Sequence, residues 1–200
     1  LEAFGNAKTT RNNNSSRFGR MVLVQFSGEN EVVGAEIRTF LLERSRVVTA
    51  SNKGERAYHI MYQVCAAGAA GCTLKIDDCR YLSMSGTTTI DGVDDVKEFK
   101  DVHNAMLTVG VGDADANQIW LFIQATLLLG NIQFGKEDAA KVQNGDVLQK
   151  VQELLGIADI TKNLETRSMT VRGNTTETPH KPYAAELARD AMVKIMYARL

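Results

Sequence analysis

The chain has 200 residues, of which 44% are hydrophobic and 24% are charged, and its formal net charge is −1. These values fit one globular domain with a real core, and the nearly neutral charge gives no electrostatic reason to expect binding to nucleic acid or to an anionic membrane. No apolar run is long enough to cross a bilayer, so we expect no transmembrane segment.

The first informative segment is the polar loop at residues 12–19, which reads Asn-Asn-Asn-Ser-Ser-Arg-Phe-Gly. Its serine hydroxyls can bind Mg²⁺, a hard cation that prefers oxygen ligands, and its asparagine amides and backbone N–H groups can hold phosphate oxygens. Arg17 never loses its charge and can pair with a carboxylate when a site closes around a ligand. The same composition is common in ordinary turns, so these residues alone leave both interpretations open.

Three short strands are predicted after this loop. Residues 21–26 form an apolar run, residues 27–30 form a turn, and the β-branched residues at 45–50 indicate the third strand. The short connections favour antiparallel pairing. Alternation from residue 33 predicts the second strand, with one face formed by Ala35, Ile37, Thr39 and Leu41.

The rest of the chain is predicted to be mostly helical, which makes the fold a mixed, helix-rich α/β domain. Helices are expected at residues 55–67, 94–109, 114–129, 146–155 and from Pro182 onward. The third of these is apolar on almost every side and should be a buried central helix.

Three finer features are predicted within this helical part. Gly130 should end the central helix, residues 167–171 should form a strand, and Pro182 suits the first turn of the last helix. One face of that last helix is predicted to contain Ala184, Leu187, Ala188, Ala191, Ile195 and Met196.

Residues 130–137 nearly match the P-loop pattern G-x-x-x-x-G-K-[ST], but we reject this interpretation. Glu137 stands where the pattern requires a hydroxyl, and its charge would repel phosphate. The segment also follows a predicted helix, whereas a P-loop follows a strand and opens a helix. The match is therefore attributed to chance.

The remaining reactive side chains form no motif. The cysteines are odd in number and have no C-x-x-C pair, which argues against a disulfide framework or a zinc site. No histidine has a cysteine or an acid at ligand spacing, and none lies near the serines of the polar loop to make a nucleophilic triad. We expect reduced thiols and structural or surface roles for Cys65, Cys72, Cys79, His59, His103 and His180.

Five blocks of the sequence resemble the myosin motor domain, in the same order along the chain. Residues 1–20, with LEAFGNAKT and later NNSSRFGR, are similar to the switch I region of that family. The other blocks are LLERSRVV, ERAYHIMYQ, LLGNIQF and ARDAMVKIMYARL. The departures from the family patterns are mild and lie outside the polar loop: Arg20, Leu129 and Met192-Val193. Kinesins share only a shorter core, an Asn, two residues and then SSR.

This resemblance implies a part of a P-loop NTPase-type motor domain, in which antiparallel strands of the twisted transducer sheet are followed by a helical subdomain. Residues 1–20 would be the switch I region, residues 21–50 the transducer strands, and residues 51–200 the helical upper actin-binding subdomain. Because the sequence begins inside a motif and stops inside a helical pattern, we expect a fragment of a larger domain.

The resemblance also implies roles in ATP and Mg²⁺ binding for the polar loop. Asn12 would contact the nucleotide phosphates, and Asn14 would belong to the same nucleotide-binding loop and help to shape it. Ser16 would be the Mg²⁺ ligand, and Ser15 would lie over the γ-phosphate and position the attacking water. Arg17 would form the closing ion pair with a switch II glutamate that this sequence does not contain.

A second functional segment, residues 170–181, is implied to be a surface loop that contacts actin ahead of the last helix. Many myosins have an acidic or phosphorylatable residue there. Counting back from Asp190 places Asn174 at that position, and a shift of one residue would place Thr175 there. Thr176 belongs to the same contact, and phosphorylation of a threonine would add negative charge. An ordinary flexible polar loop remains the alternative.

The predicted function is therefore that of an actin-based motor coupling ATP hydrolysis to force on actin filaments. Its predicted location is the cytoplasmic actin cytoskeleton, with light chains or calmodulin as further partners through a neck. The fragment alone is predicted to be inactive, because the P-loop and the switch II pattern are absent from it. The alternatives are a motor-derived binding protein without turnover and a kinesin-like microtubule motor.

Overall fold

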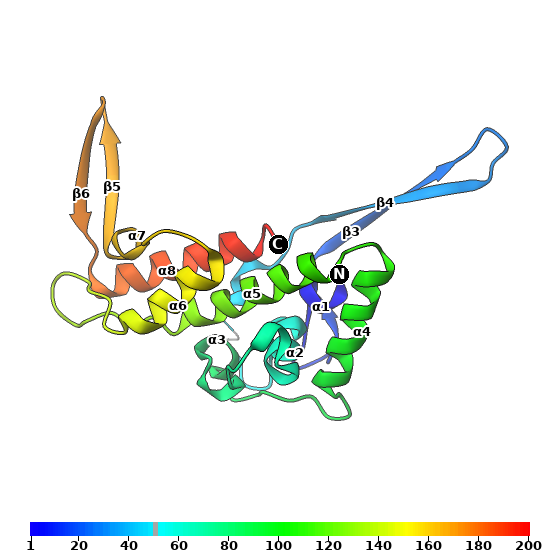
Figure 1. Ribbon diagram of the computed structural model, residues 1–200, viewed down its shortest axis with the longest axis horizontal. Coiled ribbons are helices and arrows are strands. Elements are labelled where there is room, and N and C mark those ends of the chain that lie inside the picture. Colours follow the sequence, from blue (N-terminus) through cyan, green and yellow to red (C-terminus); the bar gives the residue numbers. More distant parts are fainter. Residues whose placement is uncertain (50–51) are drawn as a thin grey trace.

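The computed structural model describes residues 1–49 and 52–200. Figure 1 shows a helical body from which two β-hairpins project in different directions. The described strands form three separate two-stranded antiparallel sheets, β1-β2, β3-β4 and β5-β6. The prediction of a mixed, helix-rich fold with antiparallel strands is confirmed.

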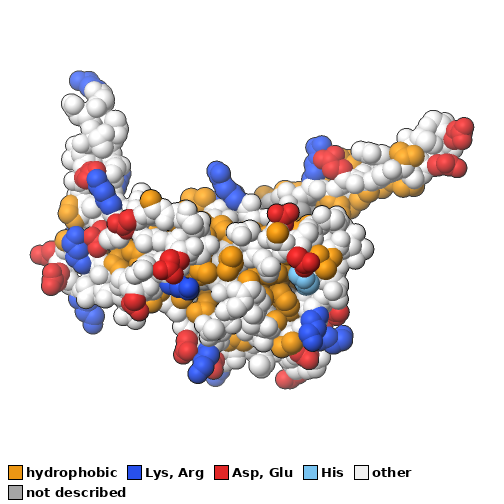
Figure 2. All heavy atoms as spheres, viewed as in Figure 1, with side chains coloured by type: hydrophobic (Ala, Val, Ile, Leu, Met, Phe, Trp, Pro, Cys, Tyr) orange, Lys and Arg blue, Asp and Glu red, His pale blue; other side chains and the backbone are white. Residues whose placement is uncertain are grey.

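The first long hairpin is the one predicted from the apolar run and the turn that follows it. Strand β3 (Gly19–Phe26) pairs with β4 (Val32–Phe40), and a register shift between Gln25 and Phe26 interrupts the ladder. Apolar side chains are exposed along this hairpin (Figure 2), although strands with this composition are usually buried.

The third predicted strand is wrong. Residues 44–47 form the 3₁₀ helix η1 (Arg44–Val47), and Ala50, at the end of the predicted strand, lies outside the described residues. The β-branched composition was misleading, because Val47 and Val48 are buried in the helical body. The buried Arg46 side chain pairs there with two carboxylates. Strand propensity takes no account of such ion pairs.

The helices follow the predicted order closely. The longer ones are α2 (His59–Ala67), α4 (Asp95–Thr108), α5 (Asp113–Gly130), α6 (Gly145–Leu155) and α8 (Pro182–Tyr197). Shorter elements are α1 (Glu2–Gly5), η2 (Ala69–Gly71), η3 (Ile76–Asp78), α3 (Arg80–Ser83) and α7 (Thr161–Glu165). Helix α2 begins four residues later than predicted, because residues 55–58 pack as buried extended chain.

Helix α5 is the central element, as its all-round apolar surface predicted. It packs against α6 and α8 on one side and against α2 and α4 on the other (Figure 1). Trp120 is buried in this helix, with its ring 5.0 Å from that of Phe99 in α4. Gly130 does not act as a left-handed cap; it is the last helical residue, where an added Cβ would lie 2.5 Å from the Tyr81 ring. Close helix–ring packing therefore explains the glycine.

The apolar face predicted for α8 is not the face that the helix buries. The buried residues of this helix are Ala185, Arg189, Val193 and Tyr197, four residues apart, whereas Leu187 is exposed. Arg189 donates from Nη1 to the carbonyl of Ile132 at 2.7 Å, so a charged residue stands at the centre of the buried face. The spacing of apolar residues alone cannot predict a buried face that contains an arginine.

Candidate functional site

The polar loop is held closed by a short sheet at its base. Strand β1 (Asn6–Ala7) pairs with β2 (Ser15–Ser16), so that Asn6 lies opposite Ser16 and Ala7 opposite Ser15. The backbone N–H of Arg17 donates to the Gly5 carbonyl at 2.8 Å and extends this connection. Residues 6–17 therefore form a loop with a fixed base, which we call the phosphate loop after the role expected for it.

Two asparagines give the phosphate loop its internal shape. Asn12 accepts a hydrogen bond at Oδ1 from the backbone N–H of Asn14 at 2.8 Å. Asn14 Oδ1 in turn accepts from Asn6 Nδ2 and lies 3.1 Å from His59 Nε2. Because Asn14 directly precedes β2 and His59 begins α2, these contacts join the base of the loop to the helical body. Sequence reasoning gave no role to His59 beyond a structural or surface one.

The two serines and the arginine lie together at the end of the loop. Arg17 Nη1 donates to Ser15 Oγ at 3.1 Å, and Ser16 Oγ donates to the Phe18 carbonyl at 3.1 Å. Ser16 is exposed, so its hydroxyl is accessible to a ligand. The structure therefore brings the Ser15 hydroxyl and the Arg17 cation together, while the Ser16 hydroxyl is turned to the Phe18 carbonyl.

The partner of Arg17 within the chain is Glu43, which the sequence analysis did not identify. Arg17 Nε donates to Glu43 Oε2 at 2.6 Å, and Arg46 Nε donates to the same oxygen at 2.7 Å. Arg46 also pairs with Glu55 at 3.1 Å. These two arginines and two glutamates make a charge-balanced group, which we call the Glu43 network.

The pKa values in this network follow from competition between burial and charge. Burial alone would raise the pKa of Glu43, but hydrogen bonds from Arg46 and Arg17 outweigh it and hold the pKa below its ordinary value. Glu55 behaves in the same way beside Arg46. Both carboxylates are therefore ionised at neutral pH. The only sequence signal for Glu43 was its place in the LLERSRVV block.

A second buried cation, Arg56, lies next to the start of the phosphate loop. Its backbone N–H donates to the Lys8 carbonyl at 3.0 Å. Its side chain is fully buried, pairs with Asp95 at 2.9 Å, and places its guanidinium carbon 3.8 Å from the centre of the Tyr62 ring. Arg56 therefore links the loop to α2 and to the first turn of α4.

The free energy of unfolding is expected to fall as the pH is lowered from about 6.5 to about 4, in part because of His59. Burial, and then the charge of Arg56, lower the pKa of His59 to about 4, whereas an unfolded histidine has a pKa of about 6.5. Between these values the unfolded chain binds a proton that the folded chain does not, so stability is lost as the pH falls. Above this window, both states are neutral.

Urea unfolding of the wild type and of His59→Gln at a series of pH values would measure this effect. The variant should lack part of the fall in stability between pH 6.5 and 4, whereas His180→Gln, a half-buried control far from Asn14 along the chain, should retain it. An identical pH profile for wild type and His59→Gln would rule out the assigned titration.

The second predicted site lies on the shorter of the two projecting hairpins. Strands β5 (Thr166–Val171) and β6 (Asn174–Pro179) are paired in register, with the turn at Arg172 and Gly173. Most of residues 170–181 therefore belong to a hairpin, and not to the loop that the actin-contact prediction and its alternative both assumed. Thr is frequent in both strands, and its β-branched side chain favours strand structure.

Asn174, Thr175 and Thr176 are all exposed at the start of β6. The Thr175 hydroxyl lies 2.9 Å from that of Thr170 on the opposite strand. Near the base of the hairpin, Lys162 and Glu177 form an ion pair at 2.5 Å. These residues lie far from the phosphate loop along the body (Figure 1), so the two predicted sites are separate.

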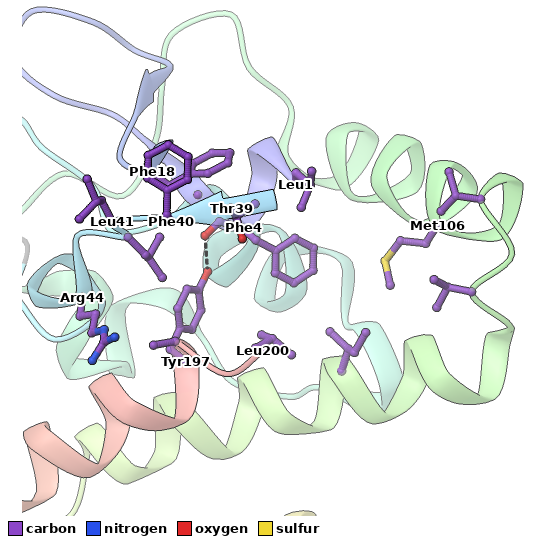
Figure 3. Close-up of a pocket in the computed structure, with 16 residues that line it drawn as sticks. Leu1, Phe4, Phe18, Thr39, Phe40, Leu41, Arg44, Met106, Tyr197 and Leu200 are labelled. Carbon is purple, nitrogen blue, oxygen red and sulfur yellow. Dashed lines mark hydrogen bonds between the residues drawn. The ribbon is translucent and has the colours of Figure 1, made fainter. Parts of the chain in front are cut away.

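An apolar groove of about 800 Å³ lies beside the phosphate loop (Figure 3). Residues from both ends of the chain line it, including Phe4, Phe18, Phe40 and Leu200, and the Tyr197 hydroxyl donates to the Phe4 carbonyl at 2.9 Å. Few polar groups converge on the groove, whereas a site for a charged ligand needs polar groups that hold the charge. The groove is therefore distinct from the nucleotide site expected at the loop.

The other reactive groups were expected to have structural or surface roles. Cys65, Cys72 and Cys79 are free and buried. Within residues 1–49 and 52–200, no three His, Cys, Asp or Glu side chains are arranged to hold a metal ion. None of the described helices combines the length and apolar character needed to cross a membrane.

Comparison with known proteins agrees with the resemblance found in the sequence. The family model "Myosin head (motor domain)" matches residues 1–200. The chain is 40% identical to Myosin-1 of Arabidopsis thaliana over 211 residues, and 41% identical to the Myosin IC heavy chain of Dictyostelium discoideum over 214 residues. Each match covers 100% of this chain and 18% of the relative, so the chain spans about a fifth of the relatives' length. The kinesin-like alternative has no support in these matches, and the chain belongs to the myosin head (motor domain) family.

Proposed function

We propose that this chain is part of an actin-based motor that couples ATP hydrolysis to force on actin filaments. The observation that carries the proposal is the phosphate loop, which has a fixed base, a contact between Arg17 and the Ser15 hydroxyl, and an exposed Ser16. It occurs in a chain that matches the myosin head over its whole length. Cytoplasmic actin filaments, and light chains or calmodulin bound elsewhere on the protein, follow from the same assignment.

In this proposal the residues of the loop bind and orient the nucleotide. Asn12 contacts the phosphates, Asn14 keeps the loop in shape, and Ser15 positions the attacking water. Ser16 fits a Mg²⁺ ligand, because its hydroxyl is exposed and oxygen is the donor that this cation prefers. Bound Mg²⁺ would neutralise charge on the phosphate oxygens. Arg17 stabilises the closed arrangement, in a reaction where positioning and electrostatics dominate.

The chain alone is proposed not to hydrolyse ATP. Residues 130–137, the near match to a P-loop, begin at the end of α5 and continue into an isolated bridge between Phe134 and Val142. A P-loop requires a strand before it and a helix after it. The cradle for the phosphates and the carboxylate partner for Arg17 are therefore assigned to other parts of the motor.

We further propose that the hairpin β3–β4 belongs to a larger, twisted transducer sheet and that residues 51–200 form the upper actin-binding subdomain. The exposure of apolar residues on the hairpin supports a packed partner on it, since such strands are normally covered. The exposed residues Asn174, Thr175 and Thr176 are proposed to contact actin. Negative charge added to either threonine by phosphorylation would change that contact.

Steady-state ATPase activity of the full-length protein that carries this chain, with and without actin filaments, tests the proposal. Hydrolysis that actin accelerates would support a motor. Nucleotide or actin binding without turnover would instead support the second candidate, a motor-derived binding protein in which the loop is only structural. The loop's intact hydroxyls and cation favour the first.

In the same assay, Ser16→Ala is expected to reduce Mg²⁺-dependent hydrolysis by about a hundredfold, the scale expected when one group that supports developing charge is removed. Ser27→Ala, in the turn of the β3–β4 hairpin, is the matched control and should retain activity. Normal Mg²⁺-dependent turnover by Ser16→Ala would remove its role as a ligand.

A further inference from the structure

Glu43 holds two arginines on one oxygen atom, and the two differ in their surroundings. Arg17 Nε and Arg46 Nε lie 2.6 and 2.7 Å from Glu43 Oε2. The Arg17 side chain is 29% exposed, whereas that of Arg46 is 8% exposed. One arginine is therefore built into the body, and the other lies at its surface at the end of the phosphate loop.

The carboxylate and its buried partner are fixed independently of the Arg17 side chain. The Tyr58 hydroxyl donates to the Glu43 carbonyl at 2.8 Å, and the Glu43 backbone N–H donates to the Arg17 carbonyl at 2.9 Å. Arg46 also reaches Glu55 at 3.1 Å. Glu43 and Arg46 thus keep their positions if only the Arg17 side chain moves.

Loss of the Arg46–Glu43 pair and loss of the Arg17–Glu43 pair would have different consequences. If Arg46 were removed, Glu55 would be left as a buried charge without its cation, which is strongly unfavourable. If Arg17 leaves, Glu43 is still paired with Arg46, and Arg17 is already partly in solvent. The Glu43 network can therefore release Arg17 without leaving a buried charge unpaired.

We propose that Glu43 is the resting partner of Arg17 and a positioning residue of the nucleotide site. Arg17 exchanges Glu43 for a carboxylate elsewhere in the motor when the site closes over nucleotide. Because Arg17 also donates to Ser15 Oγ, the exchange frees that hydroxyl for the water it is proposed to orient. The inference rests on the proposed function, and it makes Glu43 a competitor that opposes closure.

The rate at which ADP and vanadate become trapped in the full-length protein measures closure of the site. Vanadate mimics the phosphoryl group in transfer, so stable trapping requires the closed state. Glu43→Gln removes the charge but keeps the shape, and it should trap about two- to fivefold faster than the wild type, the range that a partly exposed ion pair supports. Glu55→Gln touches Arg46 but not Arg17, and it should trap at the wild-type rate.

Two more variants are needed in the trapping experiment: Arg17→Ala, and the double variant that combines Arg17→Ala with Glu43→Gln. Both should trap slowly and equally, because Glu43 acts only through Arg17. Equal rates for wild type and Glu43→Gln, or equal acceleration by Glu43→Gln and Glu55→Gln, would overturn the inference while leaving the motor assignment intact. A wild-type protein that neither traps vanadate nor hydrolyses ATP would instead contradict the proposed function. Should Glu43→Gln not fold, Glu43→Asp withdraws the carboxylate from both arginines. Arg46 keeps its pair with Glu55, whereas Arg17 is released, so this variant should also trap faster.

Discussion

Arg17→Ala in the full-length protein is expected to reduce ATP hydrolysis by about a hundredfold or more, while nucleotide affinity stays nearly unchanged. Loss of a single preorganised group that stabilises developing charge typically lowers kcat by about 10²–10³. Arg17 is proposed to secure the closed site through an ion pair, and alanine cannot replace it. Binding of the nucleotide is proposed to depend on the phosphate cradle elsewhere in the motor and on the rest of the loop, which is held by β1, β2 and the asparagine contacts.

Single-turnover hydrolysis and nucleotide titration, measured on the same preparation, separate the two effects. Arg38→Ala is the matched control, because Arg38 forms an exposed ion pair with Glu36 on the β3–β4 hairpin and lies outside the loop. That variant should hydrolyse ATP as the wild type does. Wild-type turnover by Arg17→Ala would contradict the role of Arg17 in stabilising the closed site.

Arg56→Ala is expected to destabilise the chain by about 3–5 kcal/mol, the cost of removing one partner from a buried ion pair. The Arg56 side chain is 0% exposed, and its removal leaves Asp95, only 12% exposed, without its cation. The change also opens a cavity beneath Tyr62, whose ring covers the guanidinium. Packing and charge therefore act in the same direction.

Urea unfolding followed by fluorescence would measure this loss, because the chain has 1 tryptophan. Trp120 is buried in α5 and so reports on the helical body. Lys97→Ala breaks an exposed ion pair with Asp101 on the same helix as Asp95, and it should change stability by no more than about 0.5 kcal/mol. If the two variants unfolded at the same urea concentration, the buried pair would have no special role.

Much of the fold could be predicted because its elements have strong local signals. The Asp94 side chain accepts from the N–H groups of Val96 and Lys97 and caps α4 at the predicted residue. Pro182 begins α8, and the apolar run before the turn forms β3. The 3₁₀ helix at Arg44–Val47 could not be predicted in this way, because its geometry depends on a charge pair with Glu55 that local composition does not contain.

The candidate site was predictable only as a segment. The hydroxyls, amides and cation of the phosphate loop are contiguous, so their chemistry could be inferred before the fold was known. Their supports come from distant parts of the chain: Glu43 lies 26 residues from Arg17, and His59 lies 45 residues from Asn14. Long-range pairs of this kind leave no periodic pattern, and a single sequence cannot indicate which carboxylate meets which arginine.

The contact between Tyr197 and the first helix affects how the molecule folds. The Tyr197 hydroxyl reaches the Phe4 carbonyl across 193 residues, and its ring stacks on Tyr58 with the ring centres 5.2 Å apart. Contacts of such large sequence separation form slowly, because the entropy of closing the intervening chain must be lost first. During synthesis, the segment that supports the phosphate loop therefore stays incomplete until the last turn of α8 has left the ribosome.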